Sequence, residues 1–357
     1  MTWLLLFVPV AIGLEHWMPQ QHLAIFAASG LGILPLAAWM GRATERLAEH
    51  MGEGVGGLLN ATFGNAAELI IAIAALRSGL YDVVKASIAG SIVGNILLVL
   101  GAAMVAGGVR HRQQEFNPQG ARAQATMLML AAITLILPAA YRVALGEGAE
   151  PGLVPLSVSI SVVLLLVYGL FLAFSLGTHA ALFRGSHGDH GDHDDHAASW
   201  SVGRAALVLA ASTAAIAWMS ELLVGSIQPA AKDLGLGSAF VAVFVVAILG
   251  NAAEHATAIT VAMKNRMDLA LSIAIGSSVQ VALFVAPVLV LASYFIGPTP
   301  MDLAFPRGLV LIVLLSVLIT GQVAADGRSD WLKGVQLLAA YIVLGLTFFF
   351  IPGALNR

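Results

Sequence analysis

The chain has 357 residues, of which 59% are hydrophobic and 10% are charged, and its formal net charge is −3. Because soluble domains carry about 25% charged residues, this composition excludes an ordinary soluble protein, and the lack of a basic excess argues against nucleic acid as a partner. The chain also has no cysteine, which excludes disulfides, thiolate metal ligands and cysteine nucleophiles.

Apolar runs long enough to cross a membrane recur along the whole chain. A hydrocarbon core of ~30 Å needs a helix of about 20 residues, and a helix satisfies its backbone hydrogen bonds inside lipid. We therefore predict an all-α polytopic membrane protein with about eleven transmembrane helices. In chain order, the predicted spans are residues 2–14, 23–40, 54–77, 82–108, 122–141, 152–176, 201–225, 237–263, 268–294, 303–323 and 332–351.

The first run lacks a positively charged start and a small-residue cleavage site, so we interpret it as a membrane span and not as a signal peptide. Most Lys and Arg residues fall in alternate connectors, such as those with Arg42 and Arg46, Arg110 and Arg112, and Lys264. Because positive residues accumulate on the cytoplasmic side, we predict a cytoplasmic N-terminus and a C-terminus outside. Compact connectors favour the bacterial inner membrane.

The pentapeptide Gly-Asn-Ala-Ala-Glu occurs twice, as Gly64–Glu68 and as Gly250–Glu254, inside the third and eighth predicted spans. Superposing the two copies aligns further residues: Asp82 with Asp268, Gly90–Ser91 with Gly276–Ser277, and Val93 with Val279. Such self-similarity indicates an internal duplication. The copies lie five spans apart, so they cross the membrane in opposite directions, which is the inverted repeat of many secondary transporters.

This duplication predicts four segments. They are an extra N-terminal transmembrane helix at residues 1–20, a first five-helix repeat at 21–177, a cytoplasmic His/Asp-rich linker at 178–199, and a second five-helix repeat at 200–353.

Acidic side chains inside the membrane are costly and usually mark an ion path, and here Glu68 and Glu254 lie in apolar spans. Each follows an asparagine by three residues, which places the two side chains on one helical face. These asparagines are Asn65 and Asn251. The next span of each half adds further oxygen atoms, from Ser91 and Asn95 in the first half and from Ser277 and Gln280 in the second.

Carboxylate, amide and hydroxyl oxygens together form the ligand set of a hard divalent cation such as Ca²⁺. Gly64 and Gly250 are expected to break their helices and to offer main-chain carbonyls at this site. One divalent cation or two protons would balance the two carboxylates, so the sequence predicts that protons and the cation compete for the same oxygens. His255, beside Glu254, is either a proton relay or a hydrogen-bonded core histidine.

Three segments carry a resemblance to a known family: Gly57 to Glu68, Gly250 to His255, and Gly276 to Gln280. With them the chain resembles, over essentially its whole length, the calcium/proton exchanger (cation/proton antiporter) family of the calcium/cation antiporter superfamily. The resemblance implies an eleven-helix inverted-repeat fold that binds Ca²⁺ or protons alternately. The implied ligands are Asn65, Glu68, Ser91, Asn251, Glu254, Ser277 and Gln280, with Glu45 and Glu221 near the cation entrance.

This sequence departs from the family pattern at two places. Family members often have a serine before Asn95, where this chain has Gly94. The family often has an acidic segment between its halves, whereas the linker here also contains histidine, which favours Zn²⁺, Ni²⁺ or Co²⁺ over Ca²⁺. The candidate regulatory metal ligands are His187, Asp189, His190, Asp192, His193, Asp194, Asp195 and His196. The alternative is a solvated loop.

The predicted function is a secondary active transporter that exchanges cytoplasmic Ca²⁺ for protons by alternating access. Its predicted partners are divalent cations, protons and the lipid bilayer, without a resident cofactor and without enzyme activity; the sequence gives no oligomeric state. Alternatives within transport are a sodium-coupled calcium exchanger and a proton antiporter that prefers Mn²⁺. A channel is a remoter alternative. An intramembrane metalloenzyme is remoter as well, because a zinc protease needs two histidines on one helical face.

Overall fold

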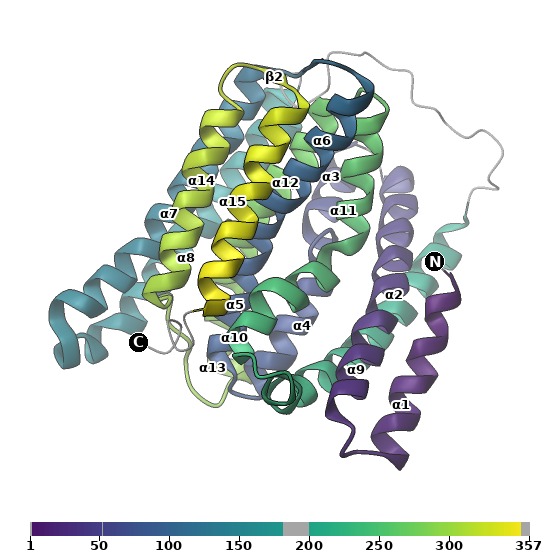
Figure 1. The fold of residues 1–357 in the computed structure, drawn as a ribbon, viewed down its shortest axis with the longest axis vertical. Helices are drawn as coiled ribbons and strands as arrows, with labels where there is room; N and C mark the ends of the chain where they lie inside the picture. Colours follow the sequence, from purple (N-terminus) through teal and green to yellow (C-terminus); the bar gives the residue numbers. More distant parts are fainter. Residues whose placement is uncertain (1, 52, 181–199, 351–357) are drawn as a thin grey trace.

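The computed structural model describes residues 2–51, 53–180 and 200–350, and these residues fold into one helical bundle (Figure 1). Its first half contains α1 (Phe7–Trp17), α2 (His22–Met51), α3 (Glu53–Phe63), α4 (Ala66–Arg77), α5 (Tyr81–Val93), α6 (Leu100–Arg110), α7 (Pro118–Leu145) and α8 (Glu150–Leu172). Its second half contains α9 (Val202–Asp233), α10 (Ser238–Val241), α11 (Ala247–Met263), α12 (Met267–Gln280), α13 (Ala286–Ile296), α14 (Arg307–Val323) and α15 (Trp331–Phe350).

Short irregular helical turns extend or join several of these helices. Among the described residues, the 3-10 turns with stated bounds include η1 (Thr2–Leu6) and η3 (Gly146–Ala149). Four are π-turns: η2 (Gly94–Val99), η4 (Ala173–Thr178), η6 (Ala242–Val246) and η7 (Val281–Val285). A π-turn inserts one residue into an α-helix and is frequent at functional sites.

Every predicted span coincides with a helical segment. Within the described ranges, eight uninterrupted helical stretches are long and apolar enough to cross a membrane, and Thr2–Trp17 and Arg307–Val323 are shorter apolar helices. The predicted span 54–77 is divided, because α3 ends at Phe63 and α4 begins at Ala66. The prediction of an all-α polytopic membrane protein is confirmed.

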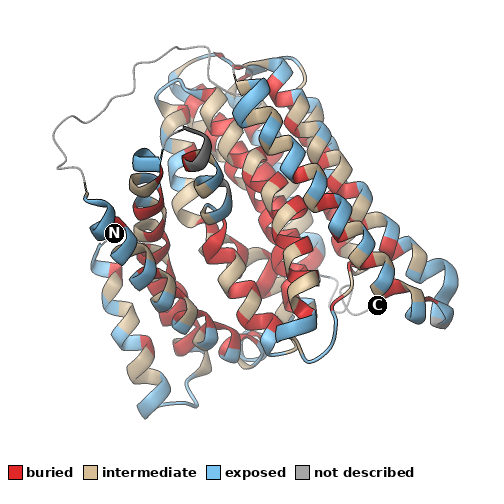
Figure 2. Ribbon diagram, turned by 180° about the vertical axis from the view of Figure 1, so that it is seen from behind, coloured by how far each residue is buried: buried red, intermediate tan, exposed pale blue. Residues whose placement is uncertain are grey.

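The helices form three groups across the bundle. α1, α2 and α9 stand on one side, α7, α8, α14 and α15 stand on the other, and the helices with the repeated motif lie between them (Figure 1). Buried residues concentrate on the middle helices, whereas outer helices carry exposed side chains (Figure 2). Ile96, Leu97 and Leu283 in the middle group have no solvent-exposed surface. Apolar residues that come directly after the predicted site residues in the sequence therefore lie in the core of the molecule.

At one end of the bundle, the connector 111–117 of the first half covers the turn between α11 and α12 of the second half. It contains strand β1 (Gln114–Glu115), which pairs antiparallel with β2 (Arg328–Ser329). Gln114 Nε2 donates to Ala262 O at 2.8 Å and to Asn265 Oδ1 at 3.0 Å. The connectors that we predicted to share the cytoplasmic side, from their Lys and Arg residues, therefore lie together at one end of the bundle.

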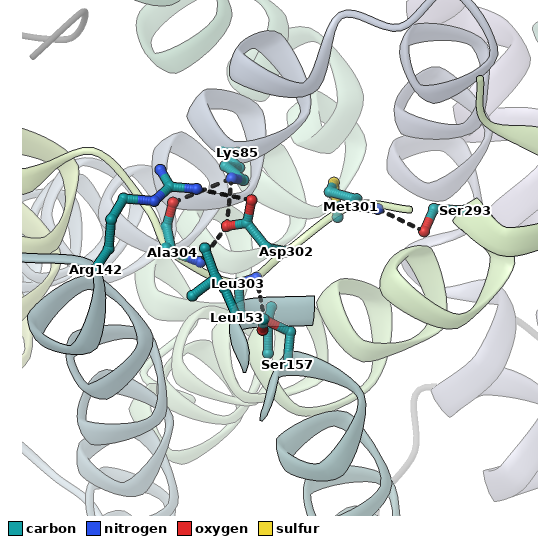
Figure 3. Close-up of polar contacts among 9 residues, drawn as sticks. All are labelled: Lys85, Arg142, Leu153, Ser157, Ser293, Met301, Asp302, Leu303 and Ala304. Carbon is teal, nitrogen blue, oxygen red and sulfur yellow. Dashed lines mark hydrogen bonds and ion pairs between the residues drawn. The ribbon is translucent and has the colours of Figure 1, made fainter. Parts of the chain in front are cut away.

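At the opposite end, the connector 297–306 of the second half covers the turn between α4 and α5 of the first half. Tyr81 OH donates to Thr299 O at 2.6 Å, and Lys85 Nζ lies 2.9 Å from Asp302 Oδ1. Arg142 contacts the other oxygen of Asp302, also at 2.9 Å (Figure 3). Each half thus holds down a turn of the other half, at opposite ends, as an inverted repeat predicts.

Candidate cation-binding site

The first copy of the motif lies at a break between two helices. Gly64 and Asn65 form a turn between α3 and α4, and Gly64 N donates to Asn60 O at 2.8 Å. Asn65 occupies the N-cap position of α4, but its side chain makes no capping bond and is free to point into the site. Glu68 falls in the first turn of α4, where the helix dipole favours a negative charge.

The second copy lies inside a continuous helix, so the expectation of a break at Gly250 is wrong. α11 runs from Ala247 to Met263 through the whole motif, and the irregular turn η6 comes before it. A glycine within a helix costs only about 1 kcal/mol, which packing readily offsets. The amide of Asn251 also donates back to Ala247 O at 3.1 Å, one turn earlier on the same helix.

Glu68 is buried, and its carboxylate is held by both halves of the protein. Ser91 Oγ of α5 and Asn251 Nδ2 of α11 both donate to Glu68 Oε1. The second carboxylate oxygen, Oε2, is buried and accepts no hydrogen bond from any described residue. One oxygen is therefore fixed by neutral donors, while the other remains available to a ligand.

Glu254 occupies the corresponding position in the second half. Its Oε2 is likewise buried without a hydrogen bond from the described part of the chain. Its other oxygen, Oε1, faces Gly64 of the first motif. Two carboxylates from oppositely running helices therefore share one site, and each has a buried oxygen that accepts no hydrogen bond from the described residues.

The glycine of each motif copy lies next to the glutamate of the other copy. A methyl group added to Gly64 would lie 3.4 Å from Glu254 Oε1, and one added to Gly250 would lie 3.0 Å from Glu68 Cγ. The glycine of each motif thus faces the glutamate of the other. A side chain at position 250 would crowd Glu68, whereas one at position 64 would meet Asn60 O, at 2.9 Å, before Glu254.

A chain of polar side chains extends from the site toward His255. Asn65 Nδ2 donates to Gln280 Oε1 at 2.5 Å, and Ser277 Oγ donates to Asn65 Oδ1 at 2.9 Å. Asn95 Nδ2 in turn donates to Ser277 Oγ at 3.2 Å, and Asn95 Oδ1 lies 3.0 Å from His255 Nε2. With this amide orientation, His255 donates from Nε2. Asn95 therefore connects the two halves.

Irregular turns follow the oxygen-bearing residues in both halves. η2 begins at Gly94, three residues after Ser91, and η7 begins at Val281, directly after Gln280. A π-turn widens the helix and leaves main-chain carbonyls without their usual partner. These turns do not follow from the sequence, because the apolar pattern continues through both without a proline, and Asn95, the polar residue inside η2, does not mark a change of helix type.

Not all predicted residues meet at this place. The structure brings together Asn65, Glu68, Ser91, Asn251, Glu254, His255, Ser277 and Gln280, with Asn95 among them. Glu45 is exposed near the end of α2, close to the start of α3, whereas Glu221 pairs with Arg77 at 2.9 Å, where α4 ends. The two acids thus lie at opposite ends of the bundle. The linker residues His187 to His196 lie outside the described residues.

Sequence reasoning missed the ion pair of Lys85 with Asp302, which fixes the start of α5, the helix that carries Ser91. Lys85 is only 4% exposed, although it lies in a membrane-spanning helix. From sequence, a lysine near the end of a span is interpreted as part of a connector, and its partner Asp302 lies 217 residues away. The acid nearest to Lys85 in the sequence is Asp82, one turn earlier on α5, so the local pattern offered no signal for a partner as distant as Asp302.

Comparison with known proteins gives consistent results. The family model "Sodium/calcium exchanger protein" matches residues 21–177 and 204–350. A Ca²⁺/H⁺ antiporter of Aphanothece halophytica is 46% identical, covering 98% of this chain and 96% of its own. The Ca²⁺/H⁺ antiporter ChaA of Bacillus subtilis is 41% identical, covering 96% of each chain. The structure of native YfkE has a TM-score of 0.81 at 39% identity, covering 96% of this chain and 97% of its own.

Proposed function

Because the chain belongs to the sodium/calcium exchanger protein family, we propose that it is a Ca²⁺/H⁺ antiporter in which Glu68 and Glu254 bind Ca²⁺ and protons in turn. One observation carries this proposal. The carboxylates of Glu68 and Glu254 face one site from the two repeat copies, and each has a buried oxygen without a hydrogen-bond donor among the described residues. Acids in that position usually serve an ion path.

The charge balance explains the exchange of ions. One Ca²⁺ neutralises both carboxylates, and so do two protons, so the empty charged site is the unfavourable state between them. Ca²⁺ takes six to eight oxygens, and the free carboxylate oxygens, the amide oxygens and the hydroxyls offer that kind of ligand. We assign the ligand role to Asn65, Glu68, Ser91, Asn251, Glu254, Ser277 and Gln280.

His255 supports a route for protons beside the cation site. Its Nε2 bonds to Asn95, which bonds to Ser277, so the imidazole is joined by hydrogen bonds to the residues around Glu254. An imidazole can accept a proton on one nitrogen and donate from the other. We propose that His255 relays or modulates proton transfer to Glu254.

We further propose the repeats at residues 21–177 and 200–353 as the two halves of the transporter, with the helix at 1–20 as an addition and the linker 178–199 as a cytoplasmic metal-sensing segment. The N-terminus is assigned to the cytoplasmic side of a bacterial inner membrane. The grouping of Arg-bearing connectors at the end that contains β1 and β2 supports this orientation.

Transport measured in proteoliposomes tests the function. Protein is reconstituted with a proton gradient, and ⁴⁵Ca²⁺ uptake and gradient dissipation are followed together. Glu68→Gln and Glu254→Gln are each expected to abolish both signals, because an amide neither balances Ca²⁺ nor releases a proton. Glu115→Gln, in the exposed part of β1, is the matched control and should transport normally. Unchanged activity in either site variant would contradict the proposal.

The driving and transported ions are separated in the same vesicles. The family model is named for sodium as well as calcium, so sodium coupling is the second candidate. Replacing Na⁺ with choline while a pH gradient is imposed should leave transport intact; loss of transport would establish sodium coupling instead. Adding Mn²⁺ and Zn²⁺ as competitors then ranks the divalent cations.

A further inference from the structure

A groove lies between α6 and α15 on the outer surface, at the end of the bundle that contains the β1–β2 pair. It has a volume of about 580 Å³ and is lined by Gly108, Val109, Arg112 and Trp331. Gly108 has no side chain and lies directly against the backbone of Trp331, so α6 and the start of α15 approach each other closely at the base of the groove. The groove belongs neither to the cation site nor to the polar chain beside it.

The side of the groove toward the membrane is apolar. Val109 is 75% exposed and Trp331 is 52% exposed, and both lie at ends of predicted membrane spans. Leu332 and Val335 continue this exposed surface along α15. In a membrane protein, exposed apolar side chains face lipid chains, and tryptophan is enriched at the level of the head groups.

The other side of the groove carries positive charge. Arg112 lines the groove, and Arg110 lies two residues before it in the chain. Both are exposed, and neither makes an ion pair or side-chain hydrogen bond with the residues that the structure describes. Arginine presents a planar set of donors that matches phosphate oxygens, often in pairs of hydrogen bonds. Two such groups next to an apolar surface are complementary to a lipid with an anionic head group.

Two nearby acids, Asp330 and Asp326, are engaged by other groups. Asp330 Oδ1 caps α15 by accepting hydrogen bonds from Leu332 N and Lys333 N. Lys333 Nζ donates to both oxygens of Asp326 at 2.7 Å, which holds the pKa of the Asp326 carboxyl below its usual value. Glu115 lies opposite Arg328 in the β1–β2 ladder.

We propose that this groove binds one anionic phospholipid. Its phosphate contacts Arg112 and Arg110, and an acyl chain lies over Val109, Leu332 and Val335. Basic pockets between transmembrane helices on the cytoplasmic side are suited to anionic head groups, and each Lys or Arg near the membrane surface contributes about 1 kcal/mol. The site is independent of Ca²⁺ transport, because it uses none of the residues of the cation site.

Native mass spectrometry of the full-length protein in detergent tests the proposal. Phosphatidylglycerol is titrated against phosphatidylcholine of the same chain length, and the former is expected to bind more tightly. Arg112→Gln should weaken phosphatidylglycerol binding about fivefold and Arg110→Gln/Arg112→Gln about 25-fold, the fold-changes that correspond to about 1 kcal/mol per arginine. Unfolding temperatures of these exposed variants should match the parent protein.

The matched control is Arg204→Gln. Arg204 lies 4.9 Å above the Trp200 ring, so it also combines arginine with tryptophan at a span end, but its guanidinium already has a partner. This variant should bind phosphatidylglycerol as the parent does. Val109→Trp fills the groove without changing charge and should weaken binding of the lipid.

Three outcomes would overturn the proposal. They are equal binding of the two lipids, unchanged phosphatidylglycerol binding in the double variant, and tight binding by Val109→Trp. A fourth outcome, tested with inorganic phosphate, would overturn it as well. Complete displacement of the lipid by millimolar phosphate would identify a simple anion site in place of a lipid site.

Discussion

Asn251, in the motif of the second half, donates a hydrogen bond to Glu68, in the motif of the first half. The asparagine of one repeat thus serves the glutamate of the other. Asn65 is not used in the same way, because it bonds to Gln280 and Ser277 and not to Glu254. The two copies have the same sequence but different partners, so equivalent substitutions should not have equivalent effects.

Substituting the two asparagines should reveal this difference. Asn251→Ala removes a donor to a carboxylate, and such bonds are worth about 1.5–3 kcal/mol, whereas bonds between neutral groups are worth about 0.5–1.5 kcal/mol. Asn251→Ala is therefore expected to lower apparent Ca²⁺ affinity by at least tenfold and Asn65→Ala by about threefold. The measurement is the calcium dependence of ⁴⁵Ca²⁺ uptake at fixed pH. Equal losses would refute the crossed arrangement.

The glycines of the motif should tolerate no side chain for reasons of function. Gly250→Ala pushes a methyl group against Glu68 Cγ, at 3.0 Å, while alanine favours the helix by up to about 1 kcal/mol. We expect transport to fall at least tenfold without loss of thermal stability. Gly94→Ala is the control, because a methyl group there meets no atom of the described chain within 4 Å. A fully active Gly250→Ala protein would show that the crowding is harmless.

The Lys85–Asp302 pair should matter for stability in an unequal way. Asp302→Asn leaves Lys85 buried without a counter-charge, and breaking a buried ion pair costs about 3–5 kcal/mol. Lys85→Met leaves Asp302 with Arg142, so it should cost less. The double variant should resemble Lys85→Met. Thermal unfolding in detergent measures these differences, and Arg77→Gln, at an exposed ion pair, should have little effect.

The two candidate entrance acids should differ in importance. Both acids are exposed, but Glu221 is paired with Arg77 at 2.9 Å, whereas Glu45 lies near the end of α2 that we assign to the cytoplasm. Exposed charge raises the local cation concentration, and salt screens it. Glu45→Gln is expected to raise the Ca²⁺ concentration needed for half-maximal transport at low ionic strength but not at high ionic strength. Glu221→Gln should change neither value; an effect of Glu221→Gln alone would reverse the assignment.

Deleting residues 187–196 tests the linker. If the His/Asp run senses metal, the deletion should change the Ca²⁺ or pH dependence of transport while leaving the maximal rate. Replacing the same ten residues with a Gly/Ser sequence of equal length controls for connector length. Unaltered dependence on both ions would leave the run as a passive connector.

The sequence predicts the fold well, because a membrane imposes simple rules. Long apolar runs can only be helices there, and the repeated Asn65–Glu68 and Asn251–Glu254 motifs define both the duplication and its inversion. The same motifs also predict that two carboxylates approach each other, since buried acids need a partner or an ion. Residues that carry oxygen at helical spacing, such as Ser91 and Gln280, follow from that reasoning.

Other features depend on three-dimensional packing. α3 ends just before Gly64, whereas α11 continues through Gly250, although the motif sequence is the same. The free-energy cost of a glycine inside a helix is small, so packing against neighbouring residues determines whether the helix continues. The crossed bond from Asn251 to Glu68 and the bridge made by Asn95 depend on how the halves dock. Nothing in the chain around Lys85 indicates Asp302, because contacts so distant in sequence leave no local pattern.

The pairing of Lys85 with Asp302 also has a consequence for biosynthesis. Lys85 is inserted with α5, long before Asp302 is translated, since 217 residues separate them. During that time a positively charged side chain in a membrane helix has no counter-charge from its final partner. Lys85 therefore meets its counter-charge only after the loop before α14 has been translated. Assembly of the first half thus depends on a segment near the end of the chain.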